Sequence, residues 1–145
     1  MYFTDKIIIA SDHAGYEMKE ALKTYLNDIQ VTVIDKGTHS ADSVDYPDYA
    51  KALCKSIEDK EASFGILLCG SANGVAMTAN KYKYIRAAIC WNSKVAELAR
   101  MHNNANVICL PARFLSLEEA KSCIDMFFTT EFEGGRHSIR VKKMC

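Results

Sequence analysis

Short apolar runs alternate with amphipathic segments along the whole chain, and this alternation restricts the possible folds more than any other feature. Most of the runs are continuously apolar, which is typical of strands that are covered on both faces. The five runs are residues 6–10, 31–34, 64–69, 85–90 and 106–110. The segments between them have a helical period, at residues 16–28, 48–60, 93–101 and 116–128. The pattern predicts an α/β protein, with a three-layer α/β/α Rossmann-like fold and a five-stranded parallel sheet.

Length and charge exclude several classes of protein. The 145 residues are expected to form a single domain over residues 1–145. Basic and acidic side chains number 18 each, so the net charge is zero, which argues against a nucleic-acid binder and a polybasic membrane-surface protein. No apolar run approaches the ~18 residues of a membrane-spanning helix, and no signal-peptide pattern is apparent. We therefore expect no nucleic-acid partner and no membrane partner.

Cysteine usage indicates free thiols. The six cysteines are residues 54, 69, 90, 109, 123 and 145. No Cys-x-x-Cys pair is present to bind zinc or to exchange disulfides. We expect six reduced thiols in a reducing cytosol, most of them buried as small apolar side chains. Because no histidine pair has the spacing of a metal motif either, we expect no metal.

Polar residues follow the first and third apolar runs, at the sheet edge where open parallel sheets bind their ligands. Ser11, Asp12 and His13 come directly after the first run. Capping of the next helix by Ser11 or Asp12 would explain them without any function. The adjacent imidazole of His13 favours a functional interpretation.

The third run ends at Cys69 and continues as Gly70-Ser71-Ala72-Asn73-Gly74 into a predicted helix. Such a turn exposes consecutive backbone N–H groups, which bind anions and favour a thiolate. A thiolate beside an anion site suits nucleophilic attack or proton abstraction next to a carbonyl. The alternative is that Cys69 is simply the last core residue of its strand, but its position at the turn favours function. The loop is neither a Walker P-loop nor a dinucleotide-binding motif.

Further imidazole and guanidinium groups follow the later elements. Ser93 is expected to cap the predicted helix over 93–101. His102 ends this helix, where a functional role and a favourable interaction with the helix dipole are equally plausible. Arg113 follows the fifth run, and the tail over 130–145 adds Arg136, His137 and Arg140. As a set, these cations are able to bind a phosphate. The tail itself is expected to be a C-terminal helix packed on a neighbour, or a frayed end.

Together these residues resemble the ribose-5-phosphate isomerase B family, which also includes galactose-6-phosphate isomerase subunits. The matches occur in the family's order over nearly the whole chain. They are residues 11–15, 35–38, 45–47, 69–71, 79–81, 85–87, 102–103, 106–107 and 133–137. The resemblance implies a cofactor-independent aldose–ketose isomerase of the non-oxidative pentose phosphate pathway, which interconverts D-ribose 5-phosphate and D-ribulose 5-phosphate through an enediolate. It also implies a homodimer, or a tetramer, whose active sites lie at the subunit interface, with residues 130–145 on the partner subunit.

The resemblance implies three catalytic residues. Cys69 matches the family's base, and Ser71 matches the hydroxyl that helps to move a proton between the substrate oxygens. His102 matches the residue that opens the furanose ring. Some members use a glutamate six residues after the cysteine, where this chain has Val75, so the chain resembles the cysteine-dependent branch.

The resemblance also implies a set of substrate-binding residues. Sugar hydroxyls would be held by Asp12 and Asn103, and Tyr46 would line the pocket. The backbone of Gly70, Ala72, Asn73 and Gly74 would form the anion hole. The phosphate would be bound by His13, Arg113, Arg136 and Arg140.

One departure from the family and several alternatives stay open at this level. The family commonly has glycine where this chain has Ala72, which would be strained if the position requires a positive φ. Another aldose phosphate, such as allose 6-phosphate or galactose 6-phosphate, is the main alternative substrate. A non-catalytic phosphosugar-binding module is disfavoured because binding needs neither Cys69 nor His102, and a thiol-redox protein is disfavoured because no Cys-x-x-Cys is present.

Overall fold

The computed structural model describes all 145 residues and confirms the predicted alternation of strands and helices. The strands are β1 (Lys6–Ser11), β2 (Thr32–Asp35), β3 (Gly65–Cys69), β4 (Ala87–Ile89) and β5 (Val107–Pro111). The helices are α1 (Tyr16–Asp28), α2 (Tyr46–Glu58), α3 (Asn73–Ala79), α4 (Ser93–Met101), α5 (Leu117–Thr129) and α6 (Arg136–Met144). None of the helices is both long enough and apolar enough to span a membrane.

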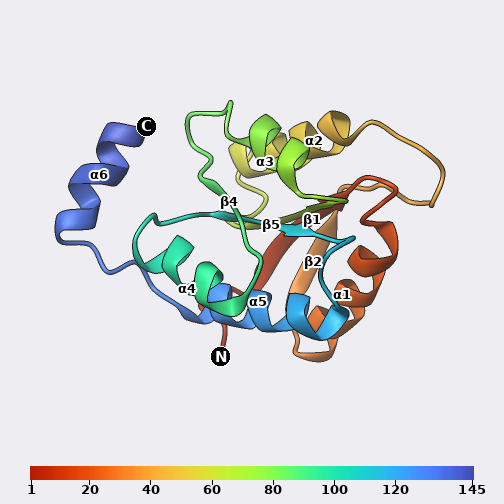
Figure 1. The fold of residues 1–145 in the computed structure, drawn as a ribbon, viewed down its shortest axis with the longest axis horizontal. Helices are drawn as coiled ribbons and strands as arrows, with labels where there is room; N and C mark the ends of the chain where they lie inside the picture. The colour runs from red at the N-terminus through yellow and green to blue at the C-terminus, as the bar shows by residue number, and fades with distance from the viewer.

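All five strands are parallel and form one sheet in the order β2-β1-β3-β5-β4 (Figure 1). The chain first runs outward from β1 to β2 and then crosses over to β3 on the other side of β1. The direction of the connections thus reverses between β1 and β3. In open parallel sheets, ligands bind beyond the carboxyl ends of the strands at such a reversal. The fold therefore places the expected site next to Ser11 and Cys69.

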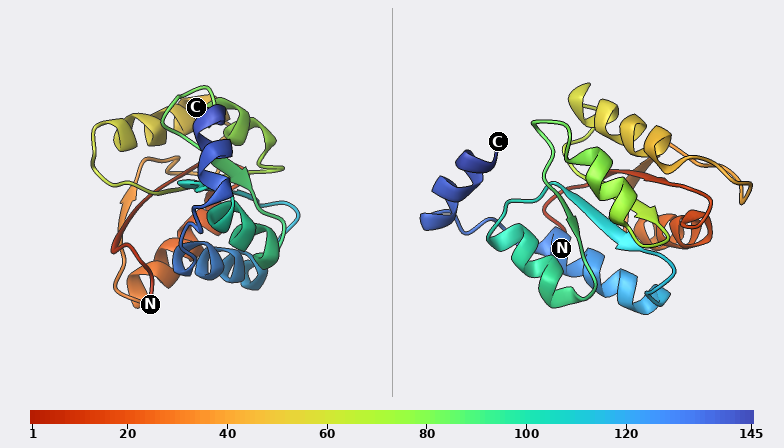
Figure 2. Two further views of the ribbon diagram at one scale, coloured as in Figure 1. Left: turned by 90° about the vertical axis from the view of Figure 1, so that its left-hand side faces the viewer. Right: turned by 45° about the horizontal axis from the view of Figure 1, so that its top comes forward.

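Helices cover both faces of the sheet, so the structure has three layers (Figures 1 and 2). Ile7 and Ile9 of β1 belong to a buried cluster with side chains of α1, α4 and α5, whereas Ile8 and Ala10 belong to a second cluster with side chains of α2 and α3. Successive side chains of a strand point to opposite faces, and here both faces are apolar. This explains why the strand sequences are continuously apolar.

The C-terminal helix α6 stands apart from the three layers (Figures 1 and 2). Its large apolar side chains Ile139 and Met144 are 61% and 56% exposed. The tail over 130–145 is thus an ordered helix at Arg136–Met144 rather than a frayed end. The apolar side chains of this helix are therefore not buried within this chain, although His137 in its first turn is.

Element boundaries differ from the sequence predictions in a few places. Asn92, and not Ser93, caps α4, since the Asn92 side chain accepts a hydrogen bond from the Val95 N–H at 2.9 Å. The edge strand β4 is shorter than the apolar run at 85–90 because Ile85 lies in a turn, where its N–H donates to Tyr82 O at 3.1 Å.

Candidate active site

Loops at the carboxyl edge of the sheet are joined by backbone hydrogen bonds. The Ala112 N–H donates to Cys69 O at 2.9 Å, and the Arg113 N–H donates to Gly70 O at 3.1 Å. These bonds continue the β3–β5 ladder beyond its last pair, Cys69 and Pro111. The loop that carries the predicted base is therefore held at a fixed position relative to the loop that carries Arg113.

A cavity of about 490 Å³ opens at this edge. The residues that line it come from the loops after β1, β3 and β5, from the last residue of β3, and from the first turns of α2 and α3. They are Asp12, Tyr46, Cys69, Gly70, Ser71, Gly74, Arg113 and Phe114. All of them except Phe114 are predicted from the sequence. Phe114 is 62% exposed and packs against Trp91 with ring centroids 5.5 Å apart; its position next to Arg113 is the only sequence signal for it.

The turn after β3 presents unpaired backbone donors. The N–H groups of Gly70, Ser71 and Ala72 make no hydrogen bond within the chain. Ala72 has φ 67° and ψ −7°, which is the left-handed region, so this position does require a positive φ. Successive N–H groups around a left-handed residue form a concave anion-binding surface. An oxyanion held at Gly70 and Ser71 would lie beside Cys69 in the cavity.

Cys69 differs from the other buried thiols by its access to the cavity. All six cysteines are free, and only Cys145 is exposed. Burial raises the pKa of the Cys54 and Cys90 thiols to about 12 and that of Cys123 to about 11, so these remain protonated thiols at neutral pH. Cys69 is 5% exposed and lines the cavity. It is thus the buried thiol that a ligand at this edge can reach.

The polar residues after β1 make hydrogen bonds within the chain and still have atoms that are free to bind a ligand. Asp12 is buried, lines the cavity, and accepts a hydrogen bond from the Gly15 N–H at 3.1 Å through Oδ1. This bond closes the turn before α1 but does not cap the helix, whose N-cap is Gly15 with no side-chain hydrogen bond, so the capping interpretation is wrong. The second carboxylate oxygen of Asp12 is left for a ligand. His13 is half-buried and does not itself line the cavity, and its Nδ1 accepts from the Val44 N–H at 3.2 Å. This bond fixes the ring and leaves Nε2 as the atom available to a ligand.

The other predicted site residues lie at the opposite edge of the sheet. Helix α4 runs back from the carboxyl edge, and His102 and Asn103 follow its last residue. The N–H of Gly65, at the amino end of β3, donates to Asn106 O at 3.0 Å, which is four residues beyond His102. Since a strand rises ~3.3 Å per residue, Gly65 and Cys69 are separated by roughly 13 Å. One copy of the chain therefore does not bring His102 or Asn103 to Cys69.

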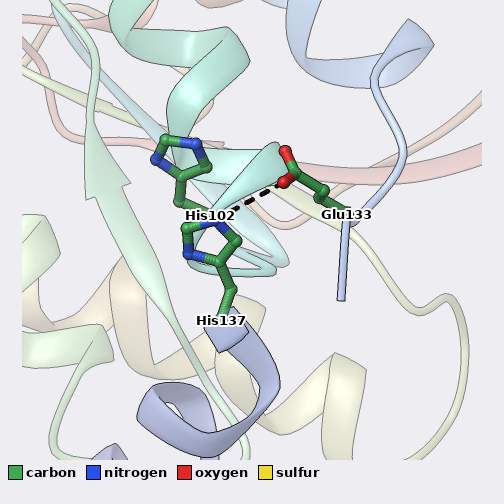
Figure 3. Close-up of side chains that lie close together, drawn as sticks. All are labelled: His102, Glu133 and His137. Atoms are coloured by element: carbon green, nitrogen blue, oxygen red, sulfur yellow. Dashed lines mark ion pairs between the residues drawn. The ribbon is translucent and has the colours of Figure 1, made fainter. Parts of the chain in front are cut away.

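Three side chains that come from separate segments meet at this second edge (Figure 3). The His102 and His137 rings are stacked, with centroids 4.2 Å apart and planes 12° apart. Glu133 Oε1 lies 3.7 Å from His137 Nε2. The sequence does not indicate that the two histidines are in contact or that Glu133 lies beside them, because Glu133 and His137 follow His102 by 31 and 35 positions.

Arg100, Arg136 and Arg140 have different roles near His102. Arg100 is buried, and it donates to Ala105 O at 2.6 Å and to Thr130 O at 3.2 Å, which fixes the segments on either side of His102. Arg136 and Arg140 lie on α6, which projects away from the sheet (Figure 1). Neither of them lines the cavity beside Cys69.

Two members of the predicted anion hole do not line the cavity. Ala72 is fully buried, and Asn73 is exposed at the start of α3, where its N–H donates to Ser71 Oγ at 3.3 Å. The Asn73 amide therefore already has a partner. The unpaired donors of the loop are those of Gly70, Ser71 and Ala72.

Comparison with known protein families accounts for this arrangement. The family model for ribose/galactose isomerases matches residues 7–144. The chain belongs to this family. It is 46% identical to the probable ribose-5-phosphate isomerase B of Mycoplasma pneumoniae, over 99% of this chain and 95% of that protein.

Crystal structures of family members have the same fold. The ribose-5-phosphate isomerase B of Thermotoga maritima is 52% identical, with a TM-score of 0.94 over 96% of each chain. The Mycoplasma genitalium enzyme, whose structure holds bound ribulose-5-phosphate, is 41% identical, with a TM-score of 0.91 over 96% of this chain and 93% of that chain. The predicted family and fold are thus confirmed.

Proposed function

We propose that this member of the family interconverts D-ribose 5-phosphate and D-ribulose 5-phosphate, as an enzyme of the non-oxidative pentose phosphate pathway in the cytoplasm. The observation that carries the proposal is the cavity in which Cys69 adjoins unpaired backbone donors and the guanidinium-bearing loop of Arg113. The relatives named ribose-5-phosphate isomerase B support the choice of substrate, and so does the ribulose-5-phosphate bound by the Mycoplasma genitalium protein.

Proton transfer is assigned to Cys69. As a thiolate, Cys69 removes the C2 proton of the open-chain aldose, and the electrons move onto the carbonyl oxygen to give an enediolate. The same sulfur returns the proton to C1, which yields the ketose. The Ser71 hydroxyl moves the remaining proton between the oxygens on C1 and C2. No electron leaves the substrate, so this reaction needs no redox cofactor.

The backbone donors of the loop stabilise the enediolate. A proton on carbon next to a carbonyl is only weakly acidic, so the charge that develops on oxygen must be stabilised strongly. The N–H groups of Gly70 and Ser71 are free and border the cavity. A preorganised donor of this kind contributes roughly 3–4 kcal/mol to the transition state. These donors, rather than the sulfur alone, then supply much of the acceleration.

A second copy of the chain completes the site in this proposal. Ring opening needs an acid–base group, and His102, to which we assign that role, lies at the far edge of its own sheet. In a homodimer, His102 and Asn103 of one copy face Cys69 of the other. Phosphate is then bound by Arg113 and His13 from one copy and by Arg136 and Arg140 from the other. A tetramer built from two such dimers is the alternative assembly.

Exposed apolar side chains support an assembly of this kind. They lie around the cavity and on α6, at Tyr46, Trp91, Phe114, Ile139 and Met144. Apolar and aromatic side chains of this size are enriched at the centres of subunit interfaces. We infer that residues 130–145 pack on the partner subunit.

The experiment is a coupled assay of the purified protein against five- and six-carbon aldose phosphates, with EDTA present throughout. We expect turnover of ribose 5-phosphate to exceed that of allose 6-phosphate and galactose 6-phosphate. Preference for a six-carbon substrate would contradict the assignment of the substrate while leaving the isomerase chemistry intact. No turnover of any aldose phosphate would contradict the proposed function.

A further inference from the structure

The cluster of His102, Glu133 and His137 has the composition of a metal-binding site (Figure 3). Each residue offers one ligand atom, and these atoms all lie within 4.8 Å of one another. Two imidazoles and a carboxylate are the donors that zinc uses when a fourth position stays open. The three residues come from the end of α4, the segment before α6 and the first turn of α6.

His137 has an unsatisfied nitrogen that faces this cluster. His137 is only 5% exposed, and its Nε2 has no hydrogen-bond partner. The carboxylate of Glu133, 3.7 Å away, is beyond hydrogen-bond distance. A buried imidazole nitrogen without a partner is available as a metal ligand.

The cluster is held by contacts that do not depend on a ligand. The Glu133 N–H donates to Met101 O at 3.0 Å, which ties the segment before α6 to the end of α4. The His137 N–H donates to Gly134 O at 3.1 Å in the turn that starts α6. The backbone positions of all three residues are thus set by the fold, and the side chains have only to rotate.

We propose that His102, Glu133 and His137 bind a zinc-like divalent cation, and that the bound ion reversibly inhibits the isomerase by occupying His102. The inhibitory part rests on the proposed function, in which His102 opens the sugar ring. A metal bond to the imidazole uses the lone pair that would accept or deliver the proton. The ion therefore blocks turnover of the cyclic sugar without touching Cys69.

The stacked rings indicate a regulatory site rather than a permanent one. Because the ring planes are only 12° apart, the nitrogen lone pairs do not converge on one point. Ligand atoms of a tetrahedral zinc ion, with bonds of about 2.0–2.1 Å, lie roughly 3.3 Å apart. Binding must therefore rotate the rings and draw the atoms together from as much as 4.8 Å. The cost of this rearrangement makes the ion exchangeable.

The binding part is tested by isothermal titration calorimetry with zinc and by the visible spectrum of the cobalt(II)-loaded protein. All variants carry Cys145→Ser, which removes the exposed thiol. We expect one ion per chain, a tetrahedral cobalt spectrum, and affinities reduced about tenfold or more by Glu133→Gln and by His137→Gln. The matched control is His39→Gln, which removes an exposed imidazole elsewhere and is expected to bind like the parent. Absent binding, or binding that these two cluster variants leave unchanged, would overturn the site.

The inhibitory part is tested by the isomerase assay with added zinc. We expect inhibition that EDTA reverses, and we expect Glu133→Gln to keep its activity in EDTA but to need about tenfold more zinc for the same inhibition. If calorimetry finds the ion at the cluster and turnover is unaffected, the inhibitory role is refuted. Absence of turnover even in EDTA is a failure of the proposed function instead, and the calorimetry still decides the site.

Discussion

The ring of Tyr46 packs so closely on Gly74 that an added Cβ at Gly74 would lie 2.2 Å from Tyr46 Cε1. Both residues line the cavity beside Cys69. Gly74 lies in the first turn of α3, and its φ is not positive. Glycine is therefore required here by the approach of the tyrosine ring and not by the backbone conformation.

Gly74→Ala is expected to displace the Tyr46 ring, to destabilise the protein by roughly 1–3 kcal/mol through overpacking, and to raise KM. Urea denaturation and steady-state kinetics measure both effects. The control is the same substitution in a Tyr46→Ala background, where the clash is gone and alanine should gain about 0.5–1 kcal/mol as the better helix former. An equal loss of stability in both backgrounds would show that Tyr46 is not the cause.

Cys69→Ala is expected to lower kcat for ribose 5-phosphate by roughly 100- to 10,000-fold, since a positioned base contributes about that much. The loss of stability should be small, about 1 kcal/mol, because only a thiol is removed from the cavity wall. Cys145→Ala, at the exposed C-terminus, is the matched control and should retain the parent kcat. Substantial activity in Cys69→Ala would assign proton transfer to another group.

Mixing two inactive variants tests whether the site is shared between two copies. Cys69→Ala and His102→Ala proteins are each expected to be inactive, but after subunit exchange half of the dimers are mixed. Each mixed dimer has one site with both residues intact, so roughly a quarter of the parent activity should return. Activity that stays at the level of the separate variants, although exchange is verified by mass, would contradict a site in which His102 of one copy serves Cys69 of the other.

The order of strands and helices could be predicted because the signals are local. The runs around Ile8, Leu67 and Ile108 are continuously apolar, as expected of strands that have helices on both faces. The rule that ligands bind beyond the carboxyl ends of parallel strands then identified the loops at Asp12, Cys69 and Arg113, which do line one cavity. Only periodicity and one topological rule were needed.

What the sequence could not provide were contacts that depend on tertiary packing. His102 and His137 are 35 residues apart and touch only because the end of α4 and the start of α6 come together in the fold. Asn92 rather than Ser93 caps α4 because the cap is decided by backbone geometry, and both residue types cap well. The positive φ of Ala72 likewise follows from the turn that joins β3 to α3.

Two residues that follow helices have a left-handed backbone conformation, and replacing either with glycine should stabilise the protein. Gln30 and Lys60 have φ of 66° and 61°, and both are exposed just after α1 and α2. The hydrogen bonds from Val31 N–H to Leu26 O and from Gln30 N–H to Asn27 O form a Schellman motif, in which glycine is the usual residue at this position.

Gln30→Gly and Lys60→Gly are each expected to stabilise the protein by about 0.5–1 kcal/mol. A left-handed conformation costs a residue with a side chain about 1–2 kcal/mol, and glycine removes this cost. Part of the gain is lost because glycine has more conformational freedom in the unfolded chain. Urea denaturation measures the change, and the two effects should add because the sites are far apart. Asp28→Gly, within α1, is the control and should be destabilising. A loss of stability in both test variants would mean that their side chains make contacts that outweigh the strain.

Asp35 stabilises the fold by pairing with a lysine that has no contact with water. Lys19 is 0% exposed, and its Nζ lies 2.6 Å from Asp35 Oδ2, while Lys23 Nζ lies 2.7 Å from the same oxygen. Burial alone would raise the pKa of Asp35, but hydrogen bonds from Lys19, Lys23 and the Gly37 N–H together hold it below its ordinary value of 3.8. The charged carboxylate is therefore favoured by folding.

Asp35→Asn is expected to lower the free energy of unfolding by roughly 2–4 kcal/mol at pH 7, since it removes the less exposed of the two carboxylates that pair with the buried Lys19 ammonium. A carboxyl whose pKa is lower in the folded state contributes its full stability above the unfolded pKa and loses it as the pH falls through the folded pKa. The difference between parent and variant should accordingly shrink as the pH falls below about 3.8. Urea denaturation at pH 7 and pH 3 measures both values. The control is Asp59→Asn, which removes an exposed ion pair with Lys55 and should change stability by about 0–1 kcal/mol at most. A similarly small effect for Asp35→Asn would mean that Glu20, 2.7 Å from Lys19, is sufficient to stabilise the buried charge.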